Sequence, residues 1–393
     1  MEVIILAGGL GTRLRSVVSE VPKCMAPVAG KPFLWYLLEQ LRGCRVERVI
    51  LSVGYLREAV ESWVAAHAGE YPFEFRFAVE TEPLGTGGGI KLAASMAEGP
   101  EVVVLNGDTY FDADLEALLK ARRESGMPVA LALKPMRDFD RYGTVELGAD
   151  GVIKAFREKQ HCSEGLINGG VYAIDRSSGI FDGLPQKFSF ETAVLEPECA
   201  RGRLCGLVQD GFFIDIGIPE DYARACSWPF LLGSGYDTLL LDRDGVINEL
   251  RPGDYVKSIG EFEWRKGVKD ALRDAAAKFP RIYVVTNQRG VGKGIMTRDA
   301  LDGIHLWMTA EIAAAGGRID GIYACTSVSD SDPCRKPNRG LFDLILKDHP
   351  EVDPSRTIMV GDSLSDRQFA ANCGIAFRMI GGSSSANVTA RGL

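Results

Sequence analysis

Two aspartates, Asp242 and Asp244, end an apolar stretch in TLLLDRD, and three further polar residues stand in short motifs downstream. These are Thr286 after YVV, Lys336 in CRKP, and Asp362 in GDS after TIMV. A carboxylate can attack phosphorus to form an aspartyl-phosphate, which splits a difficult hydrolysis into two easier steps. A second carboxylate can protonate the leaving oxygen and later activate water. The C-terminal half therefore carries residue types suited to phosphoryl chemistry.

A glycine-rich stretch, AGGLGTR, follows the first apolar run of the chain. Gly8, Gly9 and Gly11 allow backbone N–H groups to approach phosphate oxygens, and Arg13 adds a forked cation for the same charge. A dinucleotide-binding fingerprint would need glycine in place of Leu14, and a P-loop would need Gly-Lys-Ser/Thr. Taken alone, such a glycine cluster is as often a tight turn as an anion site.

Short apolar segments alternate with helical patterns along both halves, which predicts a parallel α/β architecture. In open parallel sheets, ligands collect at the carboxyl ends of the strands. The polar motifs stand at such ends, namely AGGLGTR, NGD at 106–108, DRDG at 242–245, TNQ at 286–288 and GDS at 361–363. We therefore expect a ligand site in each half.

The chain has 393 residues, which is enough for two domains at roughly 100–200 residues each. The segment RACSWPFLLGSGYD carries Pro and Gly-Ser-Gly between two complete sets of motifs, which is typical of a linker. We expect a first domain over 1–225, a linker over 226–236 and a second domain over 237–393. The halves do not repeat each other, because their motifs differ in kind.

The composition argues against several classes of partner. The net charge is −8 and there is no basic block, so nucleic acid is not an expected partner. No apolar run approaches the roughly 18 residues that would cross a membrane, and the start lacks the basic region of a signal peptide. Nine cysteines, an odd number without export signals, are typical of reduced thiols in a cytosolic enzyme. The oligomeric state stays open, with a homo-oligomer allowed.

The N-terminal half resembles the sugar-1-phosphate nucleotidyltransferases over residues 1–225. The resemblance rests on the glycine-rich stretch together with PKCMAP at 22–27, EPLGTG at 82–87, NGD at 106–108 and FIDIG at 213–217. Within this family, SVVSEVPKCMAPV, DFDRYGTV, GLINGGVY, KFSFE and FFIDIGIPEDY are most similar to the heptose 1-phosphate guanylyltransferases. The resemblance implies a Rossmann-like (GT-A-like) domain that transfers GMP from GTP to a heptose 1-phosphate and releases pyrophosphate.

The same resemblance implies roles for single residues. Asp108 and Asp215 would hold Mg²⁺, Arg13 would bind the β/γ end of the triphosphate, and Lys23 would stabilise charge at the α-phosphate. The nucleotide would contact Gly8, Gly9, Gly11, Thr12, Gly85 and Asp108. The sugar pocket would consist of Tyr142, Gly143, Glu158, Lys159, Asn168 and Gly169, with Lys159 on the sugar phosphate. Taken singly, lone lysines and carboxylates are usually solvated surface residues, and Asp108 could simply close a turn.

The C-terminal half resembles the haloacid-dehalogenase phosphatase superfamily over about 236–380, through four motifs in the right order. Only 42 positions separate Asp244 from Thr286, which leaves no room for a large cap domain, so a capless Rossmannoid domain is expected. The resemblance implies that Asp242 is the nucleophile, Asp244 the acid and base, and Thr286 and Lys336 the ligands of the phosphoryl oxygens. Mg²⁺ would be held by Asp242, Asp362 and the backbone carbonyl of Asp244, with support from Asp366.

DRDGVIN, VTNQRGVGKG and CRKP are most similar to the heptose bisphosphate phosphatases, with histidinol-phosphate phosphatases as close relatives. This implies removal of the 7-phosphate from a heptose 1,7-bisphosphate. Arg335 is expected to bind the second phosphate, with Lys293 as an alternative, and Asn287 to contact the substrate. Such phosphatases often carry a zinc loop, but CTSVSDSDPC keeps only Cys325 and Cys334. Zinc is not expected, because a tetrahedral structural site needs four Cys or His ligands.

Two other hypotheses compete with this pair of activities. Both chemistries could act on other substrates, such as UTP, CTP or dTTP in the first half and histidinol phosphate in the second. Alternatively, one half could be an inactive binding module. The second alternative is disfavoured, because both halves keep the residues of their motifs.

Overall fold

The structure is a computed structural model, and it describes residues 1–8, 14, 21–228 and 235–380. The described residues fall into two compact units, 1–226 and 227–380, which are treated separately below. Part of the expected linker, 229–234, lies outside the described residues. So do Gly9, Gly11, Thr12 and Arg13, four residues with a predicted role in binding the nucleotide.

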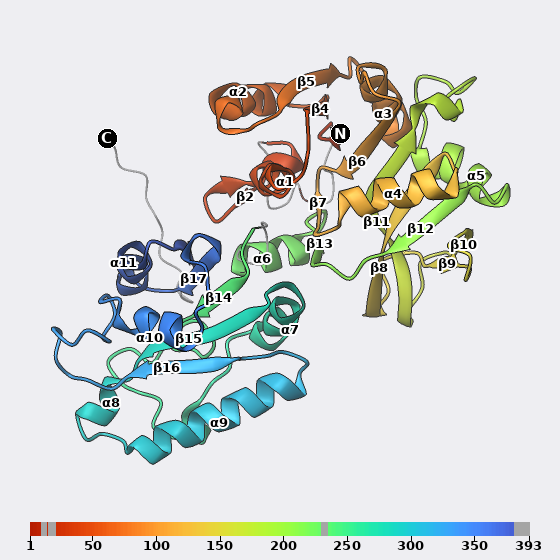
Figure 1. The fold of residues 1–393 in the computed structure, drawn as a ribbon. Helices are drawn as coiled ribbons and strands as arrows, with labels where there is room; N and C mark the ends of the chain where they lie inside the picture. The colour runs from red at the N-terminus through yellow and green to blue at the C-terminus, as the bar shows by residue number, and fades with distance from the viewer. Residues whose placement is uncertain (9–13, 15–20, 229–234, 381–393) are drawn as a thin grey trace. The chain divides into compact units, whose positions relative to one another are not determined.

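The first unit is built on a seven-stranded sheet with the order β12-β8-β11-β6-β1-β4-β5 (Figure 1). Its strands are β1 (Glu2–Leu6), β4 (Arg48–Val53), β5 (Glu74–Val79), β6 (Glu101–Asn106), β8 (Val129–Phe139), β11 (Cys162–Asp175) and β12 (Leu204–Val208). β1 pairs in parallel with β4 and β6, and β4 with β5. These strands form a run of parallel neighbours, as the sequence predicts.

The remaining elements of this unit are helices, short strands and single turns. The helices are α1 (Phe33–Arg42), α2 (Arg57–His67), α3 (Gly85–Ser95), α4 (Leu115–Ser125), α5 (Glu196–Ala200) and α6 (Pro219–Ser227). The short strands are β2 (Pro27–Val28), β3 (Lys31–Pro32), β7 (Thr109–Phe111), β9 (Val145–Leu147), β10 (Ile153–Phe156) and β13 (Phe213–Asp215). The turns are η1 (Lys23–Met25), η2 (Ala68–Glu70), η3 (Arg176–Ser178) and the π-helical η4 (Glu191–Leu195).

The sheet of the first unit is mixed, although the alternation of strands and helices in the sequence predicts parallel architecture. β11 runs antiparallel to both β6 and β8. Parallel neighbours need a crossover connection, usually a helix, whereas antiparallel neighbours do not. Between β8 and β11 the chain forms only the small β9–β10 pair, so β11 returns beside β8 in the opposite direction.

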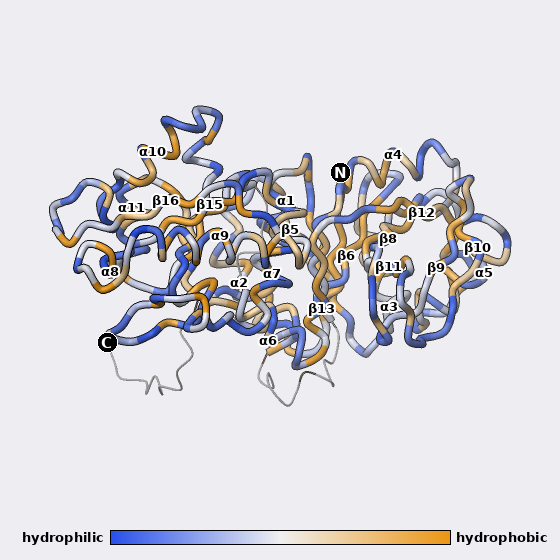
Figure 2. Tube along the Cα trace, turned by 90° about the horizontal axis from the view of Figure 1, so that it is seen from below, coloured by the Kyte–Doolittle hydropathy of each residue, from blue (hydrophilic) through white to orange (hydrophobic). Residues whose placement is uncertain are grey.

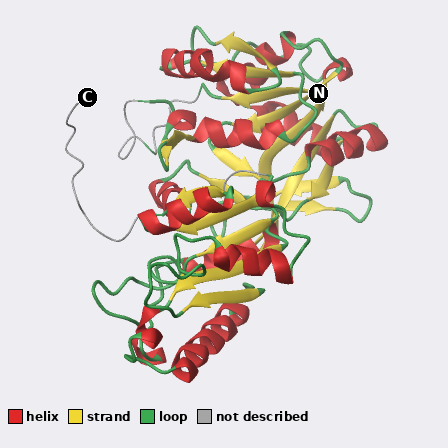
Figure 3. Cartoon of the chain, turned by 60° about the vertical axis from the view of Figure 1, so that its left-hand side comes forward, coloured by secondary structure: helices red, strands yellow, loops and turns green. Residues whose placement is uncertain are grey.

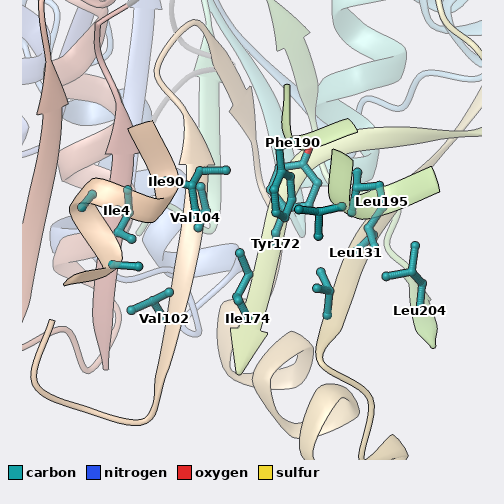
Figure 4. Close-up of a cluster of buried hydrophobic side chains, with 14 of the residues drawn as sticks. Ile4, Ile90, Val102, Val104, Leu131, Tyr172, Ile174, Phe190, Leu195 and Leu204 are labelled. Atoms are coloured by element: carbon teal, nitrogen blue, oxygen red, sulfur yellow. The ribbon is translucent and has the colours of Figure 1, made fainter. Parts of the chain in front are cut away.

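The core of the first unit lies between this sheet and the helices that cover it. Figure 4 shows labelled side chains from β1, α3, β6, β8 and β11 gathered in one cluster, among them Ile4, Val104, Leu131 and Tyr172. Each of these side chains is almost wholly buried, and burying an aliphatic side chain contributes roughly 1.5–3 kcal/mol. The cluster fixes the strand ends that carry the polar motifs.

The second unit is built on a five-stranded, wholly parallel sheet with the order β16-β15-β14-β17-β18 (Figure 3). Its strands are β14 (Thr238–Leu241), β15 (Arg281–Asn287), β16 (Gly321–Cys325), β17 (Thr357–Gly361) and β18 (Ala376–Met379). Its helices and turns are α7 (Val268–Lys278), α8 (Arg289–Gly292), α9 (Arg298–Ala314), α10 (Gly340–Asp348), α11 (Leu364–Cys373), η6 (Ile259–Glu261) and η7 (Pro354–Arg356). The parallel α/β prediction is confirmed for this unit.

The order of the strands places β14 between β15 and β17, at the point where the direction of winding changes. Such switch points are where open α/β sheets bind ligands. The segment from Asp244 to Thr286 is described throughout and holds only η6, α7 and the start of β15, so no cap domain is inserted there.

In Figure 2, hydrophobic stretches follow central strands such as β6 and β15. No helix in the described ranges combines the length and apolarity needed to cross a membrane.

Candidate active sites

The first site is created by a two-stranded ribbon that joins distant parts of the sequence. β7 pairs antiparallel with β13, which sets Asp215 opposite Thr109, and Ile216 N–H donates to the carbonyl of Asp108 at 2.9 Å. Asp108 and Asp215 therefore lie close together although 107 positions separate them in the sequence. Lys23, from η1, approaches the same place, with its Nζ 2.9 Å from Oδ2 of Asp108.

The electrostatics of this group favour a cation. Burial raises the pKa of Asp215, repulsion from Asp108 adds to the effect, and the Gly217 N–H and Lys23 oppose it. A Cβ at position 217 would lie 2.7 Å from Oδ1 of Asp215 and 3.3 Å from Nζ of Lys23, so glycine keeps this space open. Adjacent carboxylates of this kind fit Mg²⁺, which prefers oxygen ligands.

Two cavities meet at this group. The first has a volume of about 460 Å³, and its lining includes Gly8, Lys23, Glu80, Gly85, Thr86, Asp108 and Asp215. The second has a volume of about 800 Å³, and its lining includes Arg141, Tyr142, Gly143, Glu158, Lys159, Asn168, Gly169 and Asp221. Asn106, Thr109 and Asp215 line both cavities. A reactant in either cavity can thus approach the two carboxylates.

The second site lies at the carboxyl end of β14. Nζ of Lys336 is 3.0 Å from Oδ1 of Asp242 and 2.6 Å from Oδ1 of Asp366. Carboxylate oxygens of Asp242, Asp362 and Asp366 lie within 4.8 Å of one another. Burial raises the pKa of Asp242 to about 7, against the opposing effect of Lys336 and with further repulsion from Asp366 and Asp244. Three crowded carboxylates at one point fit a divalent cation.

The glycine of the DRDG motif is required by this geometry. Gly245 has a φ of +81°, which L-residues rarely adopt, and a Cβ at this position would clash with Oδ2 of Asp362. The backbone of the loop thus comes close to the carboxylate cluster. This brings the Asp244 segment next to Asp362.

Asp244 is held by a network separate from the carboxylate cluster. Its oxygens accept hydrogen bonds from Nη2 of Arg243 at 2.9 and 3.0 Å, from Nδ2 of Asn248 at 2.9 Å and from Nε2 of Gln288 at 2.7 Å. Burial alone would raise the pKa of Asp244, but Arg243 and these hydrogen bonds outweigh it and lower the pKa. Gln288 also donates to Oγ1 of Thr286 at 2.9 Å, which ties Asp244 to the end of β15.

Arg243 connects this network to the protein interior. Its side chain is wholly buried, and its Nη1 lies 3.2 Å from Nε2 of His305, on α9. Burial lowers the pKa of His305 to about 4, and Arg243 adds to the effect, so the imidazole is neutral. Arg243 thus bridges α9 and the carboxylate of Asp244.

We predict that Arg243→Met destabilises the second unit by about 3 kcal/mol, because it leaves the partly buried carboxylate of Asp244 without its cation. Urea unfolding followed by the fluorescence of Trp264 and Trp307, which pack against each other in this unit, measures the change. The control is Arg273→Met, which removes an exposed ion pair with Asp270. Equal effects of the two substitutions would contradict the prediction.

Comparison with known proteins bears directly on these two sites. Residues 2–227, more than half of the chain, match the model of the nucleotidyl transferase family. The chain belongs to the nucleotidyl transferase family. A second match, to HAD-hydrolase-like proteins, covers residues 333–388.

Individual relatives cover the two halves separately. Over 225 residues this nucleotidyl transferase is 46% identical to the D-glycero-alpha-D-manno-heptose 1-phosphate guanylyltransferase of Aneurinibacillus thermoaerophilus, covering 57% of this chain and 96% of the relative. Over 156 residues it is 44% identical to the D-glycero-alpha-D-manno-heptose-1,7-bisphosphate 7-phosphatase of Mycobacterium bovis, covering 38% and 82%. The crystal structure of HddC from Yersinia pseudotuberculosis complexed with GMP-PN is 38% identical with a TM-score of 0.52, covering 57% and 97%. The predicted resemblance of each half is confirmed.

The structure brings together most residues that the sequence singles out. The six residues predicted for the sugar pocket all line the larger cavity of the transferase unit. Asp242, Asp244, Thr286, Asn287, Lys336 and Asp362 all line one cavity of about 350 Å³ in the second unit. Asn287 and the backbone of Lys336 exchange two hydrogen bonds of 3.0 Å, which fixes the lysine beside Asp242.

The two residues predicted to bind the second phosphate, Arg335 and Lys293, do not line this cavity. Arg335 does not line the cavity beside Asp242, because its Nε pairs with Oδ1 of Asp330 at 2.9 Å and its Nη1 is buried. Lys293 does not line the cavity either, and its Nζ lies 5.4 Å from the ring centroid of Tyr255. The absence of zinc at Cys325 and Cys334 stays a prediction, and burial raises the pKa of both thiols.

Three residues for which the sequence predicted no role also line the transferase cavities, namely Glu80, Arg141 and Asp221. Arg141 pairs with Asp221 at 2.8 Å. Glu80 is the residue directly after β5, so its position at the carboxyl end of a parallel strand was the available signal.

Proposed function

We propose that the chain is a bifunctional enzyme of nucleotide-activated heptose synthesis. The second unit removes the 7-phosphate of D-glycero-α-D-manno-heptose 1,7-bisphosphate, and the first unit joins the remaining 1-phosphate to GMP from GTP, giving GDP-heptose and pyrophosphate. One observation carries the proposal: a single chain covers 96% and 82% of the lengths of two relatives whose names describe consecutive reactions. The domain junction in this proposal falls within 226–236.

In the nucleotidyl transfer, an oxygen of the sugar phosphate attacks the α-phosphorus of GTP, and the bond to pyrophosphate breaks. Both reactants are anions, so the protein mainly positions them and neutralises charge. Asp108 and Asp215 would hold Mg²⁺ where the two cavities meet, and the ion would reduce repulsion between the phosphates. Lys23, 2.9 Å from Asp108, would stabilise negative charge at the α-phosphate, and Lys159 would bind the sugar phosphate.

In the hydrolysis, a carboxylate oxygen of Asp242 attacks the 7-phosphorus while the bond to the sugar oxygen breaks. The lowered pKa of Asp244 favours its ionised form, so Asp244 takes up a proton as the substrate binds and gives it to that sugar oxygen. It then takes a proton from the water that cleaves the aspartyl-phosphate. Lys336 and Thr286 would bind phosphoryl oxygens. Asp242 and Asp362 would hold Mg²⁺, which lets an anionic nucleophile approach an anionic phosphate.

Glu80 supports guanine as the base. It lines the smaller transferase cavity, and a Cβ at Gly8 would lie 2.9 Å from its Oε1, so both residues share one wall. Ser52 Oγ and the Leu84 N–H each donate to its carboxylate at 3.0 Å, which fixes its orientation. A carboxylate only accepts hydrogen bonds, and guanine presents two adjacent donors, N1–H and N2–H, on its pairing edge.

We predict that Glu80→Gln lowers kcat/KM for GTP by about 10- to 100-fold, because the amide has one accepting oxygen in place of two and turns an NH2 donor toward the donors of guanine. The measurement is pyrophosphate release with heptose 1-phosphate and each of GTP, UTP, CTP and dTTP. Wild-type protein should prefer GTP, and the exposed control Glu82→Gln should keep that preference. Wild-type preference for another triphosphate would overturn GTP as the substrate, and an unchanged Glu80→Gln would overturn the role of Glu80.

A further inference from the structure

The cavity beside Asp242 has an unusual balance of charge. Among the described residues that line it, the acidic side chains outnumber the basic ones: Asp242, Asp244, Asp254, Asp362 and Asp366 against Arg251 and Lys336. Lys336 is already paired with two of the carboxylates, at 3.0 and 2.6 Å. A phosphate carries about −1.5 to −2 charges at neutral pH, so a substrate with a second phosphate needs a further cation.

Arg251 is placed to supply that cation. It lies on the loop between β14 and α7, and this loop is anchored by the buried side chain of Val256. Within the described ranges, its guanidinium makes one hydrogen bond, from Nη1 to the carbonyl of Glu261 at 3.4 Å. The neighbouring acid, Asp254, makes its ion pair with Lys257 at 2.6 Å. Arg251 thus keeps donors for a ligand in the cavity.

The two basic residues that the sequence predicts as ligands of the second phosphate, Arg335 and Lys293, have other partners. Arg335 is paired with Asp330 at 2.9 Å, and its Nη1 is buried from solvent. Lys293 lies against the ring of Tyr255, whose other neighbours include Gly290 of α8. Neither residue belongs to the lining of the cavity.

We infer that Arg251 binds the second phosphate of the substrate, the one that stays on the sugar when Asp242 attacks the first. The inference rests on the proposed phosphatase activity and adds the residue that makes it selective for a bisphosphate. The planar guanidinium can donate two parallel hydrogen bonds to a phosphate, which gives direction as well as charge. The loop that carries Arg251 thereby selects substrates in place of a cap domain.

The experiment compares two substrates that share the same leaving group, heptose 1,7-bisphosphate and heptose 7-phosphate, by release of inorganic phosphate. Arg251→Ala should lower kcat/KM for the bisphosphate by about 10- to 100-fold, mainly through KM, and change the value for the monophosphate less than about twofold. Arg251→Lys should recover part of the loss, because it restores charge but not the forked geometry. Lys266→Ala, which removes an exposed lysine of the same β14–α7 segment outside the cavity lining, is the matched control.

The outcomes separate the inference from the function on which it rests. If wild-type protein does not hydrolyse the bisphosphate, the proposed function and the inference both fail. Two results with an active wild-type protein would overturn the inference alone. In the first, Arg251→Ala loses activity equally on the bisphosphate and the monophosphate; in the second, Arg251→Ala keeps full activity on both. A bisphosphate-selective loss in Arg335→Ala, without one in Arg251→Ala, would assign the second phosphate to Arg335. Retained monophosphate activity shows that each variant is folded.

Discussion

Replacing Asp242 with asparagine is expected to lower phosphate release from heptose 1,7-bisphosphate by about 1,000-fold or more, a loss of about 4 kcal/mol of transition-state stabilisation. An amide does not attack phosphorus, so the aspartyl-phosphate cannot form. The fold should persist, because burial raises the pKa of Asp242 to about 7 and thus already disfavours its charge. Lys336 keeps Asp366 as a partner at 2.6 Å.

The same variant separates the two activities. Asp242→Asn should still convert added heptose 1-phosphate and GTP to GDP-heptose, because the residues proposed for nucleotidyl transfer all lie in the other unit. Asp302→Asn, which removes an exposed carboxylate paired with Arg298, is the control and should keep both activities. Phosphate release by Asp242→Asn at the wild-type rate would show that Asp242 is not the nucleophile.

Replacing Asp108 or Asp215 with asparagine is expected to lower GDP-heptose formation by about 100- to 1,000-fold, because each change removes a proposed ligand of the cation between the substrates. Asp215→Asn should not weaken the fold, since burial and repulsion from Asp108 both disfavour its charge. Thermal unfolding without Mg²⁺ tests that point. The rate of nucleotidyl transfer is measured with heptose 1-phosphate and GTP.

The control for these variants is Asp210→Asn, an exposed carboxylate in the same unit that pairs with Lys134 at 2.5 Å. It should leave the transfer rate unchanged, and all three variants should hydrolyse the bisphosphate as wild type does. Transfer at the wild-type rate in both Asp108→Asn and Asp215→Asn would contradict the proposed metal site.

The sequence predicts well those site residues that follow clearly apolar segments. Asp242 after β14 and Thr286 at the end of β15 were predicted because carboxyl ends of parallel strands converge on one edge. The direction of β11 was not predicted, since it depends on pairing with β6 and β8 rather than on any local pattern. β7 and β13, of three residues each, are too short for a periodic signal, so the contact between Asp108 and Asp215 relied on family resemblance.

Contacts between loops set the limit of sequence reasoning at the phosphate subsites. The family resemblance of the CRKP motif implied that Arg335 binds the second phosphate, but its orientation depends on Asp330, within the CTSVSDSDPC loop. Arg251 carries no motif, and only the folding of its loop places it on the cavity that contains Asp242. Glu80 is similar, since its role depends on Ser52 and the Leu84 N–H orienting its carboxylate.

The most direct test of the bifunctional proposal is a single incubation of the purified chain with heptose 1,7-bisphosphate, GTP and Mg²⁺, followed by phosphorus NMR and mass spectrometry. We expect inorganic phosphate to appear first, and GDP-heptose and pyrophosphate to follow in equal amounts. Asp242→Asn should stop at the bisphosphate, and Asp108→Asn should accumulate heptose 1-phosphate. Absence of GDP-heptose with the wild-type chain, or its formation without release of inorganic phosphate, would contradict the account.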